Sequence, residues 1–323
     1  MTKLAILDDY QKIALDCADW SSLADAVEID VFHDNIKEHD ALVERLARYD
    51  VLVIMRERTQ FPRALLKRLT NLKLLVTTSY RNRAIDLDAC SDLGVLVCHT
   101  EGGTAPTAEL TWGLILGLAK KISIENRATR AGHWGVDMAV GLSGRTLGVL
   151  GLGKLGGRIA EVGKLFEMRV MAWSENLTDA RCAELGVLRV DKETLFRESD
   201  FLTIHTVLSE RTQGLVGPEE LALMKPTAYL VNTSRGPIVQ EAALVEALTN
   251  GSIAGAGLDV FDVEPLPLDH PLRSLGERSI ITPHLGGFIE ENYRLWYGGA
   301  VEDVKAWLRH EPIRVLGGQA RSN

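Results

Sequence analysis

Three charged side chains in the second half of the chain each come a few residues after a short apolar run. They are Arg235, Glu264 and His284. Such runs alternate with amphipathic stretches, a pattern that predicts strands alternating with helices in a parallel sheet. Because the carboxyl ends of parallel strands converge on the ligand crevice, we expect the three side chains to meet at one place.

Together these residue types suit the oxidation of an alcohol that lies next to a carboxylate. Departure of a hydride from the alcohol carbon must be coupled to loss of the hydroxyl proton. His284 suits that general-base task, and in the reverse reaction it acts as the acid. Glu264 favours the protonated imidazole and fixes its ring. Arg235 offers a rigid fork that binds the substrate carboxylate and polarises the carbonyl.

Each residue also has an ordinary structural interpretation, and both readings stay open at this stage. Arg235 fits a surface position at a helix start, Glu264 fits a turn, and His284 fits a hydrogen-bonded loop. His205 and His99 also follow apolar runs but have no evident acid partner. We predict that His205 lines the cofactor side or belongs to the core.

A glycine-rich turn follows the apolar run at 147–150. Gly151, Gly153 and Gly156 form the pattern G-x-G-x-x-G between a predicted strand and a predicted helix. The first glycine allows a tight turn, the second lets the backbone approach a pyrophosphate, and the third lets the helix pack closely on the sheet. The helix N-terminus meets the charge of the phosphates. This context predicts a dinucleotide site.

The residue that recognises the ribose is expected about 20 residues further along the chain. Glu175 lies there and would accept the ribose hydroxyls while repelling a 2′-phosphate, and no Arg or Lys follows before Arg181. We therefore predict NAD. NADP stays open as the alternative, in which Glu175 is a solvated loop acid and Ser174 faces the ribose.

Composition and charge narrow the function classes. The chain has 323 residues, which predicts two domains. With 36 Lys and Arg against 44 Asp and Glu, its net charge is −8, so nucleic acid and anionic membranes are not expected partners. No window approaches 18 apolar residues, and we expect a cytoplasmic protein. The four cysteines show no metal-ligand spacing, so no metal site is predicted.

The order of predicted elements indicates how the two domains are built. In the first hundred residues we expect strands at 4–7, 51–55, 74–78 and 95–98, and in the second half at 146–150, 169–173, 201–204, 228–232, 255–260 and 279–282. A long helix over 104–122, capped by Thr104, crosses between the domains, and a last helix over 290–309 crosses back. We therefore predict one domain at 101–289 and a discontinuous one at 1–100 plus 290–323.

Four segments resemble the D-isomer-specific 2-hydroxyacid dehydrogenase family, in its phosphoglycerate dehydrogenase-like branch. They are the glycine turn at 151–156, the segment at 231–237, the segment at 257–265 and Pro-His-Leu-Gly-Gly at 283–287, and they occur in that order. The resemblance spans about residues 50–310. It implies α/β architecture, with two doubly wound parallel-sheet domains: a Rossmann-type nucleotide domain and a smaller flavodoxin-like substrate domain.

The resemblance also implies roles for individual residues. It implies a catalytic set, which is Arg235, Glu264 and His284. It implies cofactor contacts, which are Lys154 and Leu155 along the pyrophosphate, Thr206 and Thr233 lining the cofactor, and Asp259 at the nicotinamide amide. The substrate is then a small D-2-hydroxy or 2-keto acid, and the protein a homodimer formed through the nucleotide domain. The acid usual at the ribose position aligns with Ser174, which is a departure from the family pattern.

A second departure lies in the substrate loop, where the family's glycines are replaced by a segment that includes Tyr80 and Arg81. A bulky, charged Arg81 narrows the pocket and adds positive charge. Arg56 stands at another strand end. We predict that Arg56 or Arg81 binds a carboxylate or phosphate of the substrate beside Tyr80. The alternative is that the two arginines form ion pairs with Glu57 or Asp86.

A different function class remains as the alternative to an enzyme. Proteins that sense NAD(H) and act as corepressors share this fold and keep the same Arg, Glu and His set. We identify no exposed apolar groove in the first domain and no interaction tail, and these two features favour the dehydrogenase.

Overall fold

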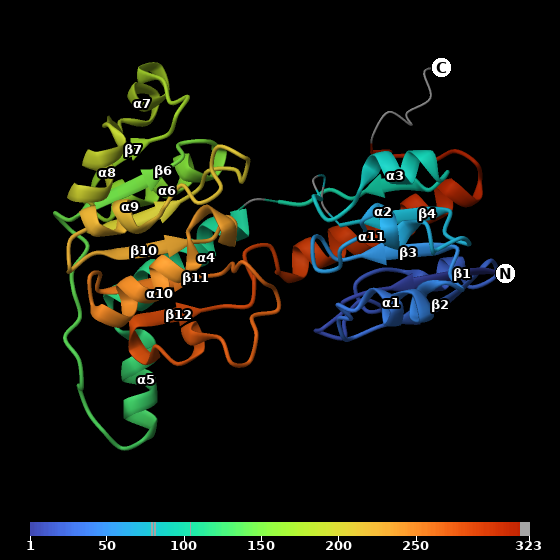
Figure 1. The fold of residues 1–323 in the computed structure, drawn as a ribbon, viewed down its shortest axis with the longest axis horizontal. Coiled ribbons are helices and arrows are strands. Elements are labelled where there is room, and N and C mark those ends of the chain that lie inside the picture. The colour runs from blue at the N-terminus through green and yellow to red at the C-terminus, as the bar shows by residue number, and fades with distance from the viewer. Residues whose placement is uncertain (79, 81, 104, 317–323) are drawn as a thin grey trace. The chain divides into compact units, whose positions relative to one another are not determined.

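The computed structural model describes residues 1–78, 80, 82–103 and 105–316. The chain forms two compact units, which we call unit 1 (Met1–Gly103 with Phe288–Asn323) and unit 2 (Thr104–Gly287). In each unit the strands form a parallel sheet that lies between helices (Figure 1). The sequence put the domain limits two or three residues away from these positions. Assigning unit 1 to the substrate stays a prediction.

Unit 1 contains a five-stranded sheet whose order is β2-β1-β3-β4-β5, with every neighbouring pair parallel. Its strands are β1 (Thr2–Ile6), β2 (Val27–Val31), β3 (Val51–Ile54), β4 (Leu74–Thr77) and β5 (Leu96–His99). Its α-helices are α1 (His39–Leu46), α2 (Arg63–Leu66), α3 (Leu87–Asp92) and α11 (Glu290–Leu308). This strand order is the flavodoxin-like one, as predicted.

The sheet of unit 1 is apolar on both faces because helices cover both of them. Leu4 and Ile6 of β1 pack with Trp296 of α11 on one face. On the other face Ala5 packs with Leu42 of α1 and with the residues of α2 and α3. Two of the predicted substrate residues follow strands of this sheet: Arg56 comes after β3 and Tyr80 after β4, at the carboxyl end of each strand.

Unit 2 contains a seven-stranded parallel sheet whose order is β12-β11-β10-β9-β6-β7-β8. Its strands are β6 (Thr146–Leu150), β7 (Arg169–Trp173), β8 (Leu188–Arg189), β9 (Phe201–Ile204), β10 (Tyr229–Asn232), β11 (Gly255–Leu258) and β12 (Ser279–Ile281). The order reverses between β6 and β9, as in Rossmann-type folds, and this switch point is where such sheets bind ligands. The predicted fold class is confirmed.

Helices cover both faces of the sheet of unit 2. Its α-helices are α4 (Ala105–Ala119), α5 (Ile122–Arg130), α6 (Lys154–Leu165), α7 (Asp179–Leu185), α8 (Lys192–Glu198), α9 (Pro218–Leu223) and α10 (Glu241–Asn250). The helices α4, α6 and α7 pack on one face, and α8, α9 and α10 on the other. Among the described residues, no helix is both long and apolar enough to span a bilayer.

The prediction of one helix over 104–122 is wrong at its C-terminal end. The helix α4 ends at Ala119, and a separate helix, α5, begins at Ile122. Between them Lys121 has a φ of 56°, a left-handed conformation through which an α-helix does not continue. The predicted cap, Thr104, lies outside the described residues.

Candidate functional site

The three residues singled out from the sequence lie on loops that leave the same edge of the sheet of unit 2. Arg235 follows β10, Glu264 lies in the loop after β11, and His284 follows β12. These strands are neighbours in the order β12-β11-β10 and run parallel to one another. Their carboxyl ends therefore present the three loops side by side.

Glu264 and His284 form a direct hydrogen bond. The imidazole Nδ1 of His284 lies 2.6 Å from Oε2 of Glu264, and the Phe261 amide donates to Oε1 at 3.0 Å. Burial alone would raise the pKa of Glu264, but the hydrogen bond and charge of His284 outweigh it and hold this pKa below its usual value. The Phe261 amide and the charge of Arg235 act in the same direction. The carboxylate is therefore ionised at neutral pH and accepts a hydrogen bond from the Nδ1–H group.

A buried carboxylate holds the loop that carries His284. Asp259 accepts from the Thr282 hydroxyl and the Leu285 amide, both at 2.6 Å, and from the Gly286 amide at 2.8 Å. These donors flank His284, whose φ of 55° is in the left-handed region. A non-glycine residue in that conformation needs surrounding contacts to hold it. Asp259 supplies them, and no pattern in the sequence indicates this role.

The loop that carries Arg235 is fixed by its own polar residues. The Asn232 side chain donates to the Arg235 carbonyl and accepts from the Ser234 amide, both at 3.0 Å. The Ser234 hydroxyl donates to the Thr206 carbonyl at 2.6 Å, which ties the loops after β9 and β10 together. A Cβ at Gly236 would lie 2.1 Å from the Phe261 carbonyl carbon, so glycine allows this loop to approach the Glu264 loop.

The helix α4 supports two of these loops with two threonines that the sequence analysis missed. Thr111 and Thr233 share a hydrogen bond between their hydroxyls at 2.8 Å, and the Thr107 hydroxyl donates to the Gly286 carbonyl at 2.6 Å. Thr107 and Thr111 are four residues apart and therefore lie on one face of the helix. That spacing is the signal from which they could have been found.

The glycine-rich turn lies between β6 and α6, next to the switch point of the sheet. Gly151 has a φ of 101°, and a Cβ at Gly156 would lie 2.0 Å from the Gly151 carbonyl oxygen. A Cβ at Gly153, by contrast, would meet no heavy atom of the described residues within 4 Å. Gly153 thus leaves open space directly before the first residue of α6, Lys154. A pyrophosphate fits such a space at a helix N-terminus.

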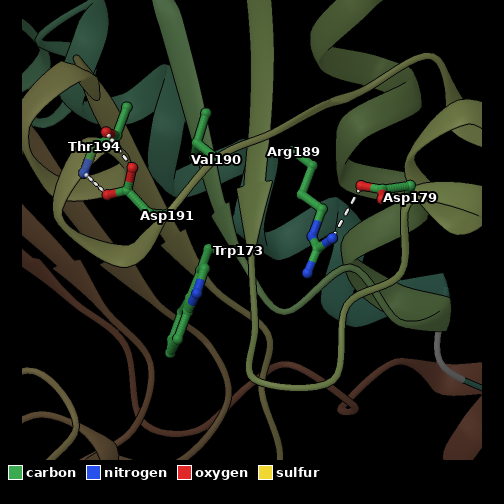
Figure 2. Close-up of a pocket in the computed structure, with 6 residues that line it drawn as sticks. All are labelled: Trp173, Asp179, Arg189, Val190, Asp191 and Thr194. Atoms are coloured by element: carbon green, nitrogen blue, oxygen red, sulfur yellow. Dashed lines mark hydrogen bonds and ion pairs between the residues drawn. The ribbon is translucent and has the colours of Figure 1, made fainter.

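The predicted ribose residues follow β7, beside an open pocket. Ser174 is half-buried and Glu175 is exposed. The residue before them, Trp173, lines a pocket of about 610 Å³ together with Arg189 and Asp179 (Figure 2). Figure 2 shows the Arg189 guanidinium directed at the Asp179 carboxylate, 3.0 Å away.

The other candidate histidines differ from His284. His205 accepts or donates a hydrogen bond with the Thr203 hydroxyl at 2.9 Å, and burial lowers its pKa to about 3. Its imidazole is therefore neutral near pH 7, which makes it a poor proton donor. His99 lies in unit 1, where the Tyr80 ring meets it edge-on with centroids 4.8 Å apart.

The predicted substrate residues lie in unit 1. Arg56 has a φ of 49°, and its carbonyl accepts from the Asn82 side chain at 2.6 Å. Its guanidinium Nε lies 3.8 Å from the Glu57 carboxylate, so the ion pair considered as the alternative is present. Tyr80 is 61% exposed, and Arg81 lies outside the described residues.

Comparison with known proteins identifies the family. Residues 112–286 match the model of the D-isomer specific 2-hydroxyacid dehydrogenase, NAD binding domain. The chain belongs to this family. The matched segment lies within unit 2, so unit 2 is an NAD-binding domain, and the predictions of the family and of NAD are confirmed. The general reaction of this family is NAD-linked hydride transfer.

Individual relatives agree with this family assignment. The chain is 40% identical to a glyoxylate reductase of Aeropyrum pernix over 255 residues, which cover 76% of each protein. It is 36% identical to a D-3-phosphoglycerate dehydrogenase of Bacillus subtilis over 88% of this chain but only 54% of that protein. Among solved structures, a phosphoglycerate oxidoreductase of Vibrio cholerae has a TM-score of 0.90 and 35% identity, covering 96% of this chain and all of that one (100%).

Replacing Asp259 by Asn tests whether this carboxylate holds the His284 loop. The amide group would turn an N–H donor toward donors that are already buried, which costs about 1–3 kcal/mol. We expect denaturant unfolding to show a loss of that size together with a fall in kcat. Asp262→Asn, an exposed residue nearby, is the control. Unchanged stability and kcat in Asp259→Asn would contradict this role.

Proposed function

We propose that this protein transfers a hydride between NAD(H) and C2 of a small D-2-hydroxy or 2-keto acid. The observation that carries the proposal is the 2.6 Å hydrogen bond between His284 and an ionised Glu264, with the positive charge of Arg235 acting on the same carboxylate. This arrangement combines a proton carrier with a site for an anionic substrate.

The proton and charge steps follow from the donors and acceptors of the site. When bound, NADH supplies the hydride that reaches C2 of the keto acid. His284, protonated on both nitrogens, gives the Nε2 proton to the carbonyl oxygen, which becomes the hydroxyl. Glu264 holds Nδ1 and stabilises the imidazolium before the transfer. Arg235 binds the carboxylate and polarises the carbonyl. In oxidation His284 takes the hydroxyl proton instead.

The proposed cofactor seat runs along the edge of the sheet. The open space at Gly153 and the N-terminus of α6 would hold the pyrophosphate, with Lys154 and Leu155 beside it. Ser174 and Glu175 would lie near the ribose. We also propose, from the family resemblance, that Thr206, Thr233 and Asp259 line the nicotinamide side.

Arg56, Tyr80 and Arg81 are proposed to select the substrate. Two relatives bear the names glyoxylate reductase and D-3-phosphoglycerate dehydrogenase, which differ in the size and charge of the acid concerned. The positive charges of Arg56 and Arg81 suit an acid with a second anionic group. The homodimer and the cytoplasmic location stay predictions, and analytical ultracentrifugation tests the first.

A substrate panel tests the proposal. Purified protein is mixed with NADH and with small 2-keto acids, with and without a phosphate, while absorbance at the nicotinamide band is followed. We expect oxidation of NADH with at least one acid and a D-2-hydroxy product by chiral chromatography. Tight NADH binding with no turnover across the panel would contradict the enzyme and favour the NAD(H)-sensing binding protein.

Changing His284 or Glu264 tests their roles in proton transfer. His284→Gln should lower kcat by about 10²–10⁴-fold, because the general acid is lost. The control is His270→Gln, since His270 forms a similar pair with Glu241, at 2.8 Å, elsewhere in unit 2. If both variants lost activity equally, His284 would have no special role.

The pH dependence of Glu264→Gln tests the carboxylate separately. The pKa of Glu264 is lowered, so its negative charge is present at every pH above that value and favours the imidazolium. Without it, the alkaline limb of keto-acid reduction should move to lower pH by about one unit or more. A pH–rate profile of kcat measures the shift, and an unmoved limb would contradict the coupling.

Gly153→Ala tests the pyrophosphate seat. The added methyl meets no described protein atom within 4 Å, so the fold should tolerate it, yet it occupies the space proposed for the cofactor. We expect the Kd for NADH to rise about tenfold or more with an unchanged Tm. Gly141→Ala, which is equally free of close neighbours among the described residues, is the control. Normal NADH binding by Gly153→Ala would exclude this seat.

Arg56→Met tests the substrate prediction. Loss of the guanidinium should raise KM for an acid with a second anionic group by about tenfold or more, while kcat changes less. Arg68→Met removes an exposed arginine of unit 1, paired with Asp40, and serves as the control. Equal KM values in wild type and Arg56→Met for every acid would contradict a role of Arg56 in substrate binding.

A further inference from the structure

One arginine of α7 reaches back to the glycine-rich turn. The Arg181 Nε donates to the Leu152 carbonyl at 3.3 Å, and Nη2 donates to the Gly153 carbonyl at 3.4 Å. Its third nitrogen, Nη1, donates to the Glu184 carboxylate at 2.8 Å. The guanidinium is thus tethered on its own helix while it contacts two consecutive carbonyls of the turn.

A glycine outside the dinucleotide pattern makes room for this arginine. Gly157 follows Gly156, the last glycine of G-x-G-x-x-G, and the pattern itself does not require it. A Cβ at Gly157 would lie 2.9 Å from Arg181 Nη2 and 3.2 Å from a methyl group of Leu185. The packing of α7 therefore explains why α6 has a glycine at position 157. The Arg181 guanidinium is the group nearest to the place that a Cβ would occupy.

The contact with Arg181 also fixes which way the amides of the turn point. In a trans peptide the C=O and the following N–H point in opposite directions. When the Leu152 and Gly153 carbonyls face Arg181, the N–H groups of Gly153 and Lys154 face away from it. These are the first amides at the N-terminus of α6, where an anion is bound.

We propose that Arg181 is a positioning residue for the pyrophosphate loop: it holds two carbonyls of the turn so that their partner amides meet the dinucleotide. The inference rests on the proposed function, in which this turn binds the pyrophosphate. Arg181 acts through the backbone of the turn, and the absence of a side chain at Gly157 leaves the space that its guanidinium occupies.

The experiment measures NADH affinity and steady-state kinetics for Arg181→Met and Gly157→Ala. The first variant removes the guanidinium, and the second displaces it while keeping its charge. Both should raise the Kd for NADH and the KM for NAD by about tenfold, because the two hydrogen bonds from Arg181 that orient the turn are lost. The kcat at saturating cofactor should stay within about twofold, because the chemical groups are untouched.

Matched variants separate this role from general destabilisation. Arg169→Met removes an exposed guanidinium that pairs with Glu198 at the opposite end of β7, and the affinity of this variant for NADH should equal that of wild type. Arg181→Lys should recover part of the affinity that Arg181→Met loses. The double variant Gly157→Ala with Arg181→Met should bind NADH no more weakly than the single variant of lower affinity, because both substitutions disturb the same contact.

The outcomes distinguish this inference from the cofactor seat. If Gly153→Ala binds NADH like wild type, the pyrophosphate seat itself is wrong. If Gly153→Ala loses affinity while Arg181→Met and Gly157→Ala keep it, only the role of Arg181 is overturned. A fall in kcat at constant KM, or independent effects that multiply in the double variant, would also overturn it.

Discussion

The hydrogen bond between His284 and Glu264 is the interaction on which the rest of the site depends. It requires a histidine in a left-handed backbone conformation and a half-buried carboxylate whose pKa is kept low. Neither condition arises from the two residues alone. Asp259 accepts from the Thr282 hydroxyl before His284 and from the Leu285 and Gly286 amides after it, and neighbouring parallel strands bring the two loops together. The order of the strands therefore brings His284 and Glu264 near each other, and hydrogen bonds to the backbone then fix their geometry.

A second His–Glu pair in the same unit shows why proximity alone is a weak sign of chemistry. His270 and Glu241 are also in hydrogen-bond contact, at 2.8 Å. His270, however, has an ordinary backbone conformation with a φ of −65° and lies at the start of a short 3-10 helix. Backbone strain at His284, and the charge of Arg235 acting on its partner, set the first pair apart.

Much of the fold and of the site could be predicted from the sequence, because apolar runs mark the strands and charged residues after them mark the strand ends. The strands β2 and β8 were missed. The five residues of β2, Val-Glu-Ile-Asp-Val, do alternate apolar and charged residues and could have been found, whereas β8 has only two residues, both exposed. The end of α4 was missed because the left-handed Lys121 is neither Gly nor Pro. Contacts between distant segments, such as that of Arg181 with the glycine turn, leave no mark in a single sequence.

The state of the His284 ring tests the central claim most directly, and ¹⁵N NMR of the protein with labelled histidine, assigned with His284→Gln, measures it. The account predicts that Nδ1 carries a proton at every pH from about 6 to 9, because an ionised Glu264 accepts a hydrogen bond from Nδ1–H. It also predicts that the ¹⁵N signal of Nδ1 is altered in Glu264→Gln. A neutral ring whose only proton is on Nε2, with Nδ1 bare, would contradict the account.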